Sequence, residues 1–208
     1  MAIVVSIEET KLHQEKLNKV KSEISKIVVG QEKIVHSLLI SLLSKGHVIL
    51  EGSPGLAKTL LIQTFATITG CSFSKINFTP DLLFREIMGA TNCNEKSNES
   101  SFVNNPTFTN FLIADEINKA SPKLQTELFK YIQESQINLD KPSFNLPLPF
   151  FVIATSNSIE TKNIYNLSES KADKFLFKII IDCPSLESEK QIFRKNITIH
   201  KFEEFEVK

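Results

Sequence analysis

The stretch His47-Val-Ile-Leu-Glu-Gly-Ser-Pro-Gly-Leu-Ala-Lys-Thr59 decides the fold class of this 208-residue chain. It begins with a short apolar run, residues 47–50, which predicts a buried strand. Residues 52–59 match the pattern G-x-x-x-x-G-K-[ST], except that Ala57 replaces the second glycine. Residues 59–68 then predict a helix. A strand, a glycine-containing loop and a helix in this order point backbone N–H groups and a helix N-terminus at one place, which favours a bound phosphate.

Two side chains at the end of this loop have the chemistry that a phosphate site needs. The Lys58 ammonium supplies a point charge for phosphate oxygens, and the Thr59 hydroxyl is a suitable ligand for Mg²⁺. Ala57 requires an explanation, because glycine is favoured where φ is positive or where the backbone approaches a ligand closely. We expect a right-handed helical φ at Ala57, since this residue adjoins the start of the helix.

Strand-like runs alternate with helical patterns along the whole chain. Besides residues 47–50, short runs rich in branched or aromatic residues occupy 74–78, 111–114, 150–154 and 177–181. Helical spacing of apolar residues covers 9–27, 31–44, 59–68, 122–133 and 185–196. We expect a further helix to start at Thr79-Pro-Asp81, and Gly46 to be the C-terminal glycine of the second helix. The alternation predicts an α/β fold whose five-stranded, mainly parallel sheet lies between helices.

Three segments fit neither pattern. Residues 92–105 are the most polar stretch and predict a surface loop or a small hairpin insert. Residues 141–149 contain three prolines and are expected to be a connection into the fourth strand. Residues 197–208 follow neither a helical nor a strand period.

Polar residues end two of the predicted strands. Asp115 and Glu116 follow the apolar run 111–114, at the sheet edge where open α/β sheets bind ligands. We expect Asp115 to hold Mg²⁺ and Glu116 to activate a water for attack on a terminal phosphate. Asn157 follows the run 150–154, and its uncharged amide is suited to orienting that water.

Composition excludes several classes of function. Lys and Arg number 24, as do Asp and Glu, so no net charge draws the chain to nucleic acid, and a helicase-like motor on DNA is disfavoured. No apolar run is long enough to span a membrane, and we expect a cytoplasmic protein without membrane insertion. The three cysteines, Cys71, Cys93 and Cys183, have no zinc-site spacing and are expected to be reduced.

Several longer strings make the chain similar to a known family. The strings are Val29-Gly-Gln-Glu32, Pro54-Gly-Leu-Ala-Lys-Thr59, Phe78-Thr-Pro-Asp-Leu-Leu83, Ala114-Asp-Glu-Ile-Asn118 and Ala154-Thr-Ser-Asn157. Together they resemble the MoxR branch of the AAA+ ATPases over about residues 25–195. Alanine before the loop lysine is usual in that branch.

The resemblance implies a P-loop NTPase core that binds ATP and Mg²⁺ between the subunits of a ring, commonly a hexamer. It also implies chaperone-like remodelling or maturation of protein complexes, in which partners often carry a von Willebrand A domain. Glu116, Asn157 and Lys174 are the expected catalytic residues, with Thr59 and Asp115 as metal ligands. The expected cofactor-binding residues are Val29, Gly30, Gly52, Ser53, Pro54, Gly55, Leu56, Ala57, Lys58, Thr59, Leu60 and Asp115.

The chain departs from the family pattern at two places. Lys174 stands where the family has an arginine that reaches the γ-phosphate of the neighbouring subunit, and lysine lacks the planar fork that engages two oxygens. The family also continues into a helical lid with a second sensor arginine. Here we expect an ATPase core with N-terminal helices at 1–183 and, at 184–208, only the beginning of an incomplete lid, in which Arg194 lies too early to be that sensor. A binding module with little hydrolysis is therefore the alternative function.

Overall fold

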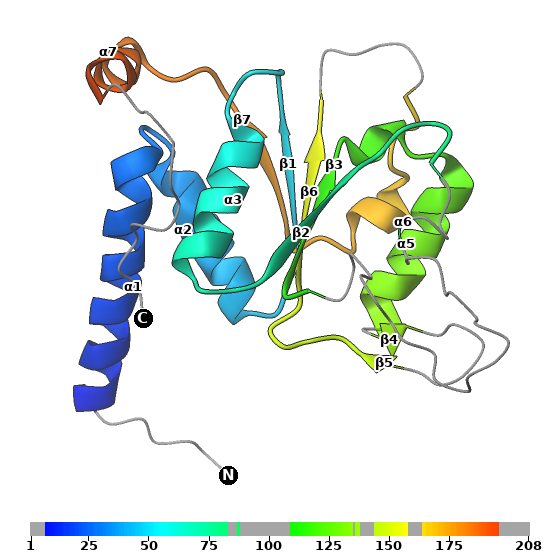
Figure 1. Ribbon diagram of the computed structural model, residues 1–208, viewed down its shortest axis with the longest axis horizontal. Helices are drawn as coiled ribbons and strands as arrows, with labels where there is room; N and C mark the ends of the chain where they lie inside the picture. Colours follow the sequence, from blue (N-terminus) through cyan, green and yellow to red (C-terminus); the bar gives the residue numbers. More distant parts are fainter. Residues whose placement is uncertain are drawn as a thin grey trace, which may run out of the picture.

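The computed structural model describes residues 7–82, 87, 109–134, 136–137, 144–157 and 164–195. These residues form three layers, with one sheet between two groups of helices (Figure 1). On one face of the sheet lie α1 (Ile7–Ile27), α2 (Glu32–Leu43) and α3 (Lys58–Ile68), and on the other lie α5 (Pro122–Glu134) and α6 (Glu169–Ala172). The last described helix, α7 (Leu186–Lys195), lies beyond the upper end of α1 in this view.

The central sheet has five strands, all parallel. They are β1 (Val48–Gly52), β2 (Phe73–Asn77), β3 (Phe111–Asp115), β6 (Phe151–Ser156) and β7 (Phe177–Ile181), in the order β2-β3-β6-β1-β7. The predicted α/β fold is confirmed, and each strand lies within two residues of its predicted bounds. Because β6 lies between β1 and β3, the loop after β1 and the polar residues that end β3 and β6 meet at one edge of the sheet.

The three inner strands, β1, β3 and β6, are buried on both faces, which is why they are nearly continuous apolar runs instead of alternating ones. Leu112 and Ala114 of β3 pack into the core on the α5 side, while Phe111 and Ile113 pack into the core that α1, α2 and α3 cover. Phe65 of α3 stacks on Phe111 with ring centroids 5.8 Å apart. These two cores fix the strands from both sides and so hold the sheet edge in place.

The turn after α2 differs by one residue from the expectation. Lys45, not Gly46, has the left-handed backbone, with a φ of 55°. The Gly46 N–H donates to the Ser41 carbonyl at 2.9 Å, as expected for the second residue past the end of a helix. Glycine is needed at position 46 for another reason, because a Cβ there would lie 2.7 Å from the Leu176 side chain.

The sequence did not predict the short helix α6 or two further small elements. A two-stranded antiparallel sheet pairs β4 (Gln136–Ile137) with β5 (Phe144–Asn145), so the expected connection at 141–149 contains a strand. A single 3-10 turn, η1 (Ile117–Lys119), follows β3. The predicted surface loop at 92–105, most of the helix expected after Asp81, and residues 197–208 lie outside the described residues. Cys71 and Cys183 are free thiols, and Cys93 also lies outside that part of the chain.

Candidate functional site: a nucleotide cleft at the carboxyl edge of the sheet

The loop between β1 and α3 depends on two glycines. A Cβ on Gly52 would lie 2.7 Å from the Ile181 carbonyl oxygen, so only glycine allows β1 and β7 to pair this closely. Gly55 has a φ of 81°, in the left-handed region that favours glycine. The loop therefore turns sharply at Gly55 and enters α3 at Lys58.

The expected right-handed φ at Ala57 is wrong. Ala57 has φ 54° and ψ 27°, which is left-handed, and α3 begins only at the next residue. A left-handed conformation brings the Cβ of a non-glycine residue close to the following carbonyl oxygen. The loop therefore keeps the backbone shape of a glycine at this position while bearing a methyl group.

This strain gives a stability prediction. Ala57→Gly is expected to raise the free energy of unfolding by about 0.5–1 kcal/mol, because relief of about 1–2 kcal/mol of strain outweighs the roughly 0.5–1 kcal/mol entropic cost of glycine. Urea unfolding followed by circular dichroism measures the change. The matched control is Ala66→Gly inside α3, which is expected to lower stability; a loss of stability in both variants would contradict the strain at Ala57.

A cavity of about 360 Å³ opens beside this loop. Three chain segments line it: the loop and first turn of α3, the end of β3, and the end of β6. The lining residues are Pro54, Gly55, Leu56, Ala57, Lys58, Thr59, Leu60, Asp115, Glu116, Thr155, Ser156 and Asn157. The structure thus brings together in one cavity the loop lysine, the acid pair and the asparagine that the sequence pointed to separately.

The Lys58 ammonium lies over the loop itself. Its Nζ donates to the carbonyl oxygens of Gly52 and Ser53, each at 2.7 Å. Burial lowers the pKa of Lys58, and the carboxylates of Asp115 and Glu116 act in the opposite direction. Gly52 and Ser53, which do not line the cavity, therefore serve the site by holding this cation with their carbonyl groups.

Asp115 lies at the centre of a polar network. Its Oδ1 accepts from the Thr155 hydroxyl at 2.5 Å, and its Oδ2 lies 2.7 Å from Lys75 Nζ and 3.4 Å from Thr59 Oγ1. Burial by itself would raise the pKa of Asp115, but the hydrogen bonds from Lys75 and Thr155 and the charge of Lys75 bring the pKa below its usual value. Asp115 is therefore a carboxylate at neutral pH.

Glu116 turns the chain out of β3 with a left-handed backbone, φ 58°. Its N–H donates to Thr155 Oγ1 at 2.9 Å, which ties the end of β3 to β6. Its carboxylate pairs with Lys119 Nζ at 2.9 Å, and the Glu116 side chain remains 40% exposed. Strained non-glycine residues of this kind concentrate at functional sites, where the surrounding structure holds them.

Asn157 follows β6 and is buried. Its carbonyl accepts from the side-chain Nδ2 of Asn118 at 3.3 Å, and the Asn118 carbonyl accepts from the Tyr165 N–H at 2.7 Å. Asn118 thereby links the turn after β3 to the end of β6. The Oδ1 atom of Asn118 is buried and has no hydrogen-bond partner, which is uncommon for a buried polar atom and costs free energy.

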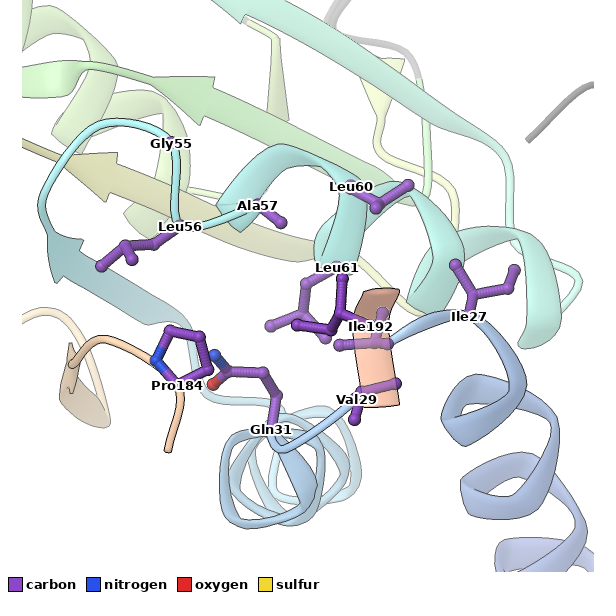
Figure 2. Close-up of a pocket in the computed structure, with 11 residues that line it drawn as sticks. Ile27, Val29, Gln31, Gly55, Leu56, Ala57, Leu60, Leu61, Pro184 and Ile192 are labelled. Atoms are coloured by element: carbon purple, nitrogen blue, oxygen red, sulfur yellow. The ribbon is translucent and has the colours of Figure 1, made fainter. Parts of the chain in front are cut away.

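A second, apolar cavity of about 140 Å³ adjoins the first and shares the loop with it. Figure 2 shows side chains from the α1–α2 connection, the loop, α3 and α7 pointing toward a common space. The lining residues are Ile27, Val28, Val29, Gln31, Gly55, Leu56, Ala57, Leu60, Leu61, Pro184 and Ile192. An apolar slot with few polar groups beside an anion-binding loop has the form expected for the heteroaromatic base of a nucleotide. The phosphates of that nucleotide would extend into the larger cavity.

Comparison with protein families agrees with this geometry. Residues 47–177, more than half of the chain, match the model of the ATPase family associated with various cellular activities (AAA). The chaperone MoxR1 of Mycobacterium tuberculosis is 45% identical over 177 residues, which cover 85% of this chain and 47% of that protein. The chain is a MoxR-type member of the AAA ATPase family. YeaC of Bacillus subtilis is 37% identical over 190 residues, covering 91% of this chain and 59% of YeaC.

A solved structure supports the same family at the level of the fold. A protein from Cytophaga hutchinsonii, described as a candidate ATPase, superposes with a TM-score of 0.75 at 38% identity and covers 89% of this MoxR-type chain. The chain covers 58% of that structure and about half of the relatives' length. Within the described residues, no helix combines the length and the apolar character needed to cross a bilayer.

The oxygens in the larger cavity fit the Mg²⁺ that accompanies ATP in the AAA family. Thr59 Oγ1 and Asp115 Oδ2 lie 3.4 Å apart on the cavity wall, and a hydroxyl and a carboxylate are the hard ligands that Mg²⁺ takes together with phosphate oxygens. No group of three or more His, Cys, Asp or Glu side chains that could hold a metal occurs in the described part of the chain. The remaining ligands of the metal would therefore be phosphate oxygens of the nucleotide and water.

Besides Gly52 and Ser53, two expected site residues of this MoxR-type chain, Gly30 and Lys174, lie outside both cavities. Gly30 is next to the lining residues Val29 and Gln31, but it has a φ of 75° and faces α7, where an added Cβ would be 2.6 Å from Ser188 Oγ. Lys174, just after α6, lines neither cavity. Lys174 thus has no described role in the site of its own chain.

Sequence reasoning assigned no role to three residues of the network. Thr155 lies in the stretch Ala154-Thr-Ser-Asn157, and its hydroxyl both accepts from the Glu116 N–H and donates to Asp115. Lys119 pairs with Glu116, three residues before it, which a spacing argument could have found. Lys75 gives no sequence signal, because its contact with Asp115 depends on the pairing of β2 with β3.

Proposed function

We propose that this MoxR-type chain binds Mg²⁺·ATP and hydrolyses it. One observation carries the proposal: a single cavity beside the loop between β1 and α3 contains Lys58, Asp115, Glu116 and Asn157, which come from three different segments. An apolar slot for the base continues from the same loop. Anion-binding loop, carboxylate pair and uncharged amide are the parts that phosphoryl transfer to water requires.

Each of these residues has a distinct part in the proposed reaction. The loop N–H groups and Lys58 hold the phosphates, and Thr59 and Asp115 would hold Mg²⁺, which when bound supplies positive charge to the phosphate oxygens. The water oxygen attacks the γ-phosphorus while the bond to the bridging oxygen breaks and ADP leaves with its electron pair. Glu116 accepts the proton of that water, and the Asn157 amide orients it.

Lys119 affects whether Glu116 is free to act as the general base. The Glu116 carboxylate is engaged by Lys119 at 2.9 Å, so Glu116 must exchange that ion pair for the attacking water before it accepts a proton. An ion pair with a partly exposed carboxylate contributes roughly 1 kcal/mol or less, so bound nucleotide and water can displace it.

We further propose a ring, commonly a hexamer, that performs chaperone-like remodelling or maturation of protein complexes, with von Willebrand A domain proteins as a partner class. The support is the MoxR family and the place of Lys174 outside both cavities of its own chain, which leaves it available to a neighbouring subunit. Analytical ultracentrifugation with and without Mg²⁺·ATP tests the ring; a monomer at all protein concentrations in both conditions would overturn it.

Nucleotide binding is the first test of the function. Wild type is expected to bind a fluorescent ATP analogue in the presence of Mg²⁺, and Lys58→Ala is expected to bind it about 30-fold more weakly, because one charge-assisted hydrogen-bonding cation is lost. Lys123→Ala on α5, across the sheet, is the matched control and should bind like wild type. The function would be wrong if wild type showed no Mg²⁺-dependent binding, or if both variants bound equally well.

A further inference from the structure

Lys75 lies on β2 and forms an ion pair with Asp115 on the neighbouring strand β3. In the parallel register of β2 and β3, Lys75 is opposite Ile113 and Asn77 is opposite Asp115. The lysine stem reaches one pleat along the sheet to place Nζ 2.7 Å from Asp115 Oδ2. The side chains are 30% and 16% exposed, respectively, so this ion pair is only partly screened by water.

The oxygen that Lys75 occupies is also the one that faces the metal position. Asp115 Oδ1 is engaged by Thr155, whereas Oδ2 lies toward Thr59 Oγ1, the second expected metal ligand. The ammonium and a divalent cation would therefore use the same oxygen. Two cations close to one carboxylate oxygen repel each other strongly in a partly buried site.

The charges around the cavity also disfavour a lone divalent cation. The ammonium groups of Lys58, Lys75 and Lys119 lie on or beside the two carboxylates of Asp115 and Glu116, so three positive charges face two negative ones. Such a site attracts a polyphosphate anion and repels a lone divalent cation. A nucleotide triphosphate reverses this balance by bringing its own negative charge.

We propose that Lys75 is an internal counter-ion that excludes a lone divalent cation from Asp115, so that the site takes up the metal only together with nucleotide. This inference rests on the proposed binding of Mg²⁺·ATP. In the nucleotide-free chain Lys75 holds the Asp115 carboxylate in place through the ion pair with Oδ2. When Mg²⁺·ATP enters, the phosphates attract the ammonium groups and Oδ2 becomes available to the metal. Lys75 is thus a positioning residue for the metal ligand.

Binding of Mn²⁺ in the absence of nucleotide tests this role without reference to activity. Electron paramagnetic resonance of free Mn²⁺ is followed during titration into wild type, Lys75→Met and Lys178→Met. Lys178, on the opposite edge strand β7, pairs with Glu51 at 2.8 Å, so its substitution removes the same charge from a comparable ion pair. Lys75→Met is expected to bind Mn²⁺ at least about tenfold more tightly than either other protein, since one adjacent charge changes cation affinity at a carboxylate by about that factor or more.

Equal Mn²⁺ affinity of Lys75→Met and Lys178→Met would overturn the proposal, and so would the absence of measurable binding by Lys75→Met. Lys75→Arg keeps the charge and should behave as wild type; tighter Mn²⁺ binding by this variant would also overturn it. Circular dichroism melting shows that each variant is folded. ATP binding measured on the same samples separates the two proposals: if ATP binds and Lys75→Met shows no gain, only the counter-ion role fails, and if Mn²⁺ affinity rises but ATP does not bind, only the ATPase function fails.

Discussion

Glu116→Gln is expected to lower the rate of ATP hydrolysis by roughly 10³-fold while ATP still binds with near wild-type affinity. Glutamine keeps the shape and the hydrogen-bonding oxygen of the side chain but cannot accept the proton of the attacking water, and general-base catalysis contributes about 10²–10⁴-fold. The hydrogen bond to Thr155 Oγ1 is donated by the backbone N–H of Glu116 and does not involve its side chain, so the left-handed turn is expected to remain. Phosphate release under saturating Mg²⁺·ATP measures the rate, and fluorescence titration measures the affinity.

The matched control is Glu15→Gln on α1, which also removes one carboxylate and should hydrolyse ATP at the wild-type rate. Retention of more than a tenth of the rate by Glu116→Gln would exclude Glu116 as the base. Tight ATP binding by wild type without phosphate release, unrestored by Lys174→Arg, would favour the binding module over the ATPase. A rate gain in Lys174→Arg would instead show that the planar fork of an arginine is what the chain lacks.

Acidification from pH 7 to pH 4 is expected to remove about 3 kcal/mol of the free energy of unfolding through His47 alone. Burial lowers the pKa of His47 from 6.5 to about 4, and each unit of difference between folded and unfolded pKa corresponds to about 1.36 kcal/mol. The unfolded chain takes up the proton first as the pH falls below 6.5. Stability is therefore complete above pH 6.5, falls as the pH approaches 4, and changes no further below that value through this group.

The contact that requires neutral His47 is specific. His47 Nδ1 accepts the Val152 N–H at 3.1 Å, so the ring proton is on Nε2, and the ring packs edge-on against Phe150 with centroids 5.9 Å apart. Urea unfolding at a series of pH values gives the dependence. His47→Asn keeps an acceptor but does not titrate, and should lose about 3 kcal/mol less than wild type between the two pH values. His13→Asn on α1 is the control and should follow wild type; identical pH dependence of His47→Asn and wild type would exclude the mechanism.

The sequence predicts the architecture well because the two-sided burial of a parallel sheet leaves a strong pattern. Phe111 to Ala114 is apolar at every position, and both faces of β3 are in fact buried. The residues that chain order places after strands, Asp115, Glu116 and Asn157, lie in one cavity because parallel strands end at the same edge. These inferences need only local pattern and one topological rule.

What the sequence could not predict depends on contacts between distant segments. The left-handed backbone of Ala57 and Lys45 is not the default of either residue and is imposed by the surrounding loop. The need for glycine at position 46 comes from Leu176, which is distant in the chain. The ion pair of Lys75 with Asp115 follows from the register of β2 against β3, and a lysine in an edge strand otherwise indicates only a solvent-facing position.

The composition of the apolar slot has a consequence for α7. Pro184 and Ile192 follow the last strand of the central sheet, whereas Val28, Val29 and Gln31 precede its first strand. A base in this slot would therefore touch a segment before β1 and a segment after β7. Ile192 is 41% exposed and would lose contact with water there. A ligand stabilises the structure that is required to bind it. A base in the slot is therefore expected to hold α7 against the connection between α1 and α2.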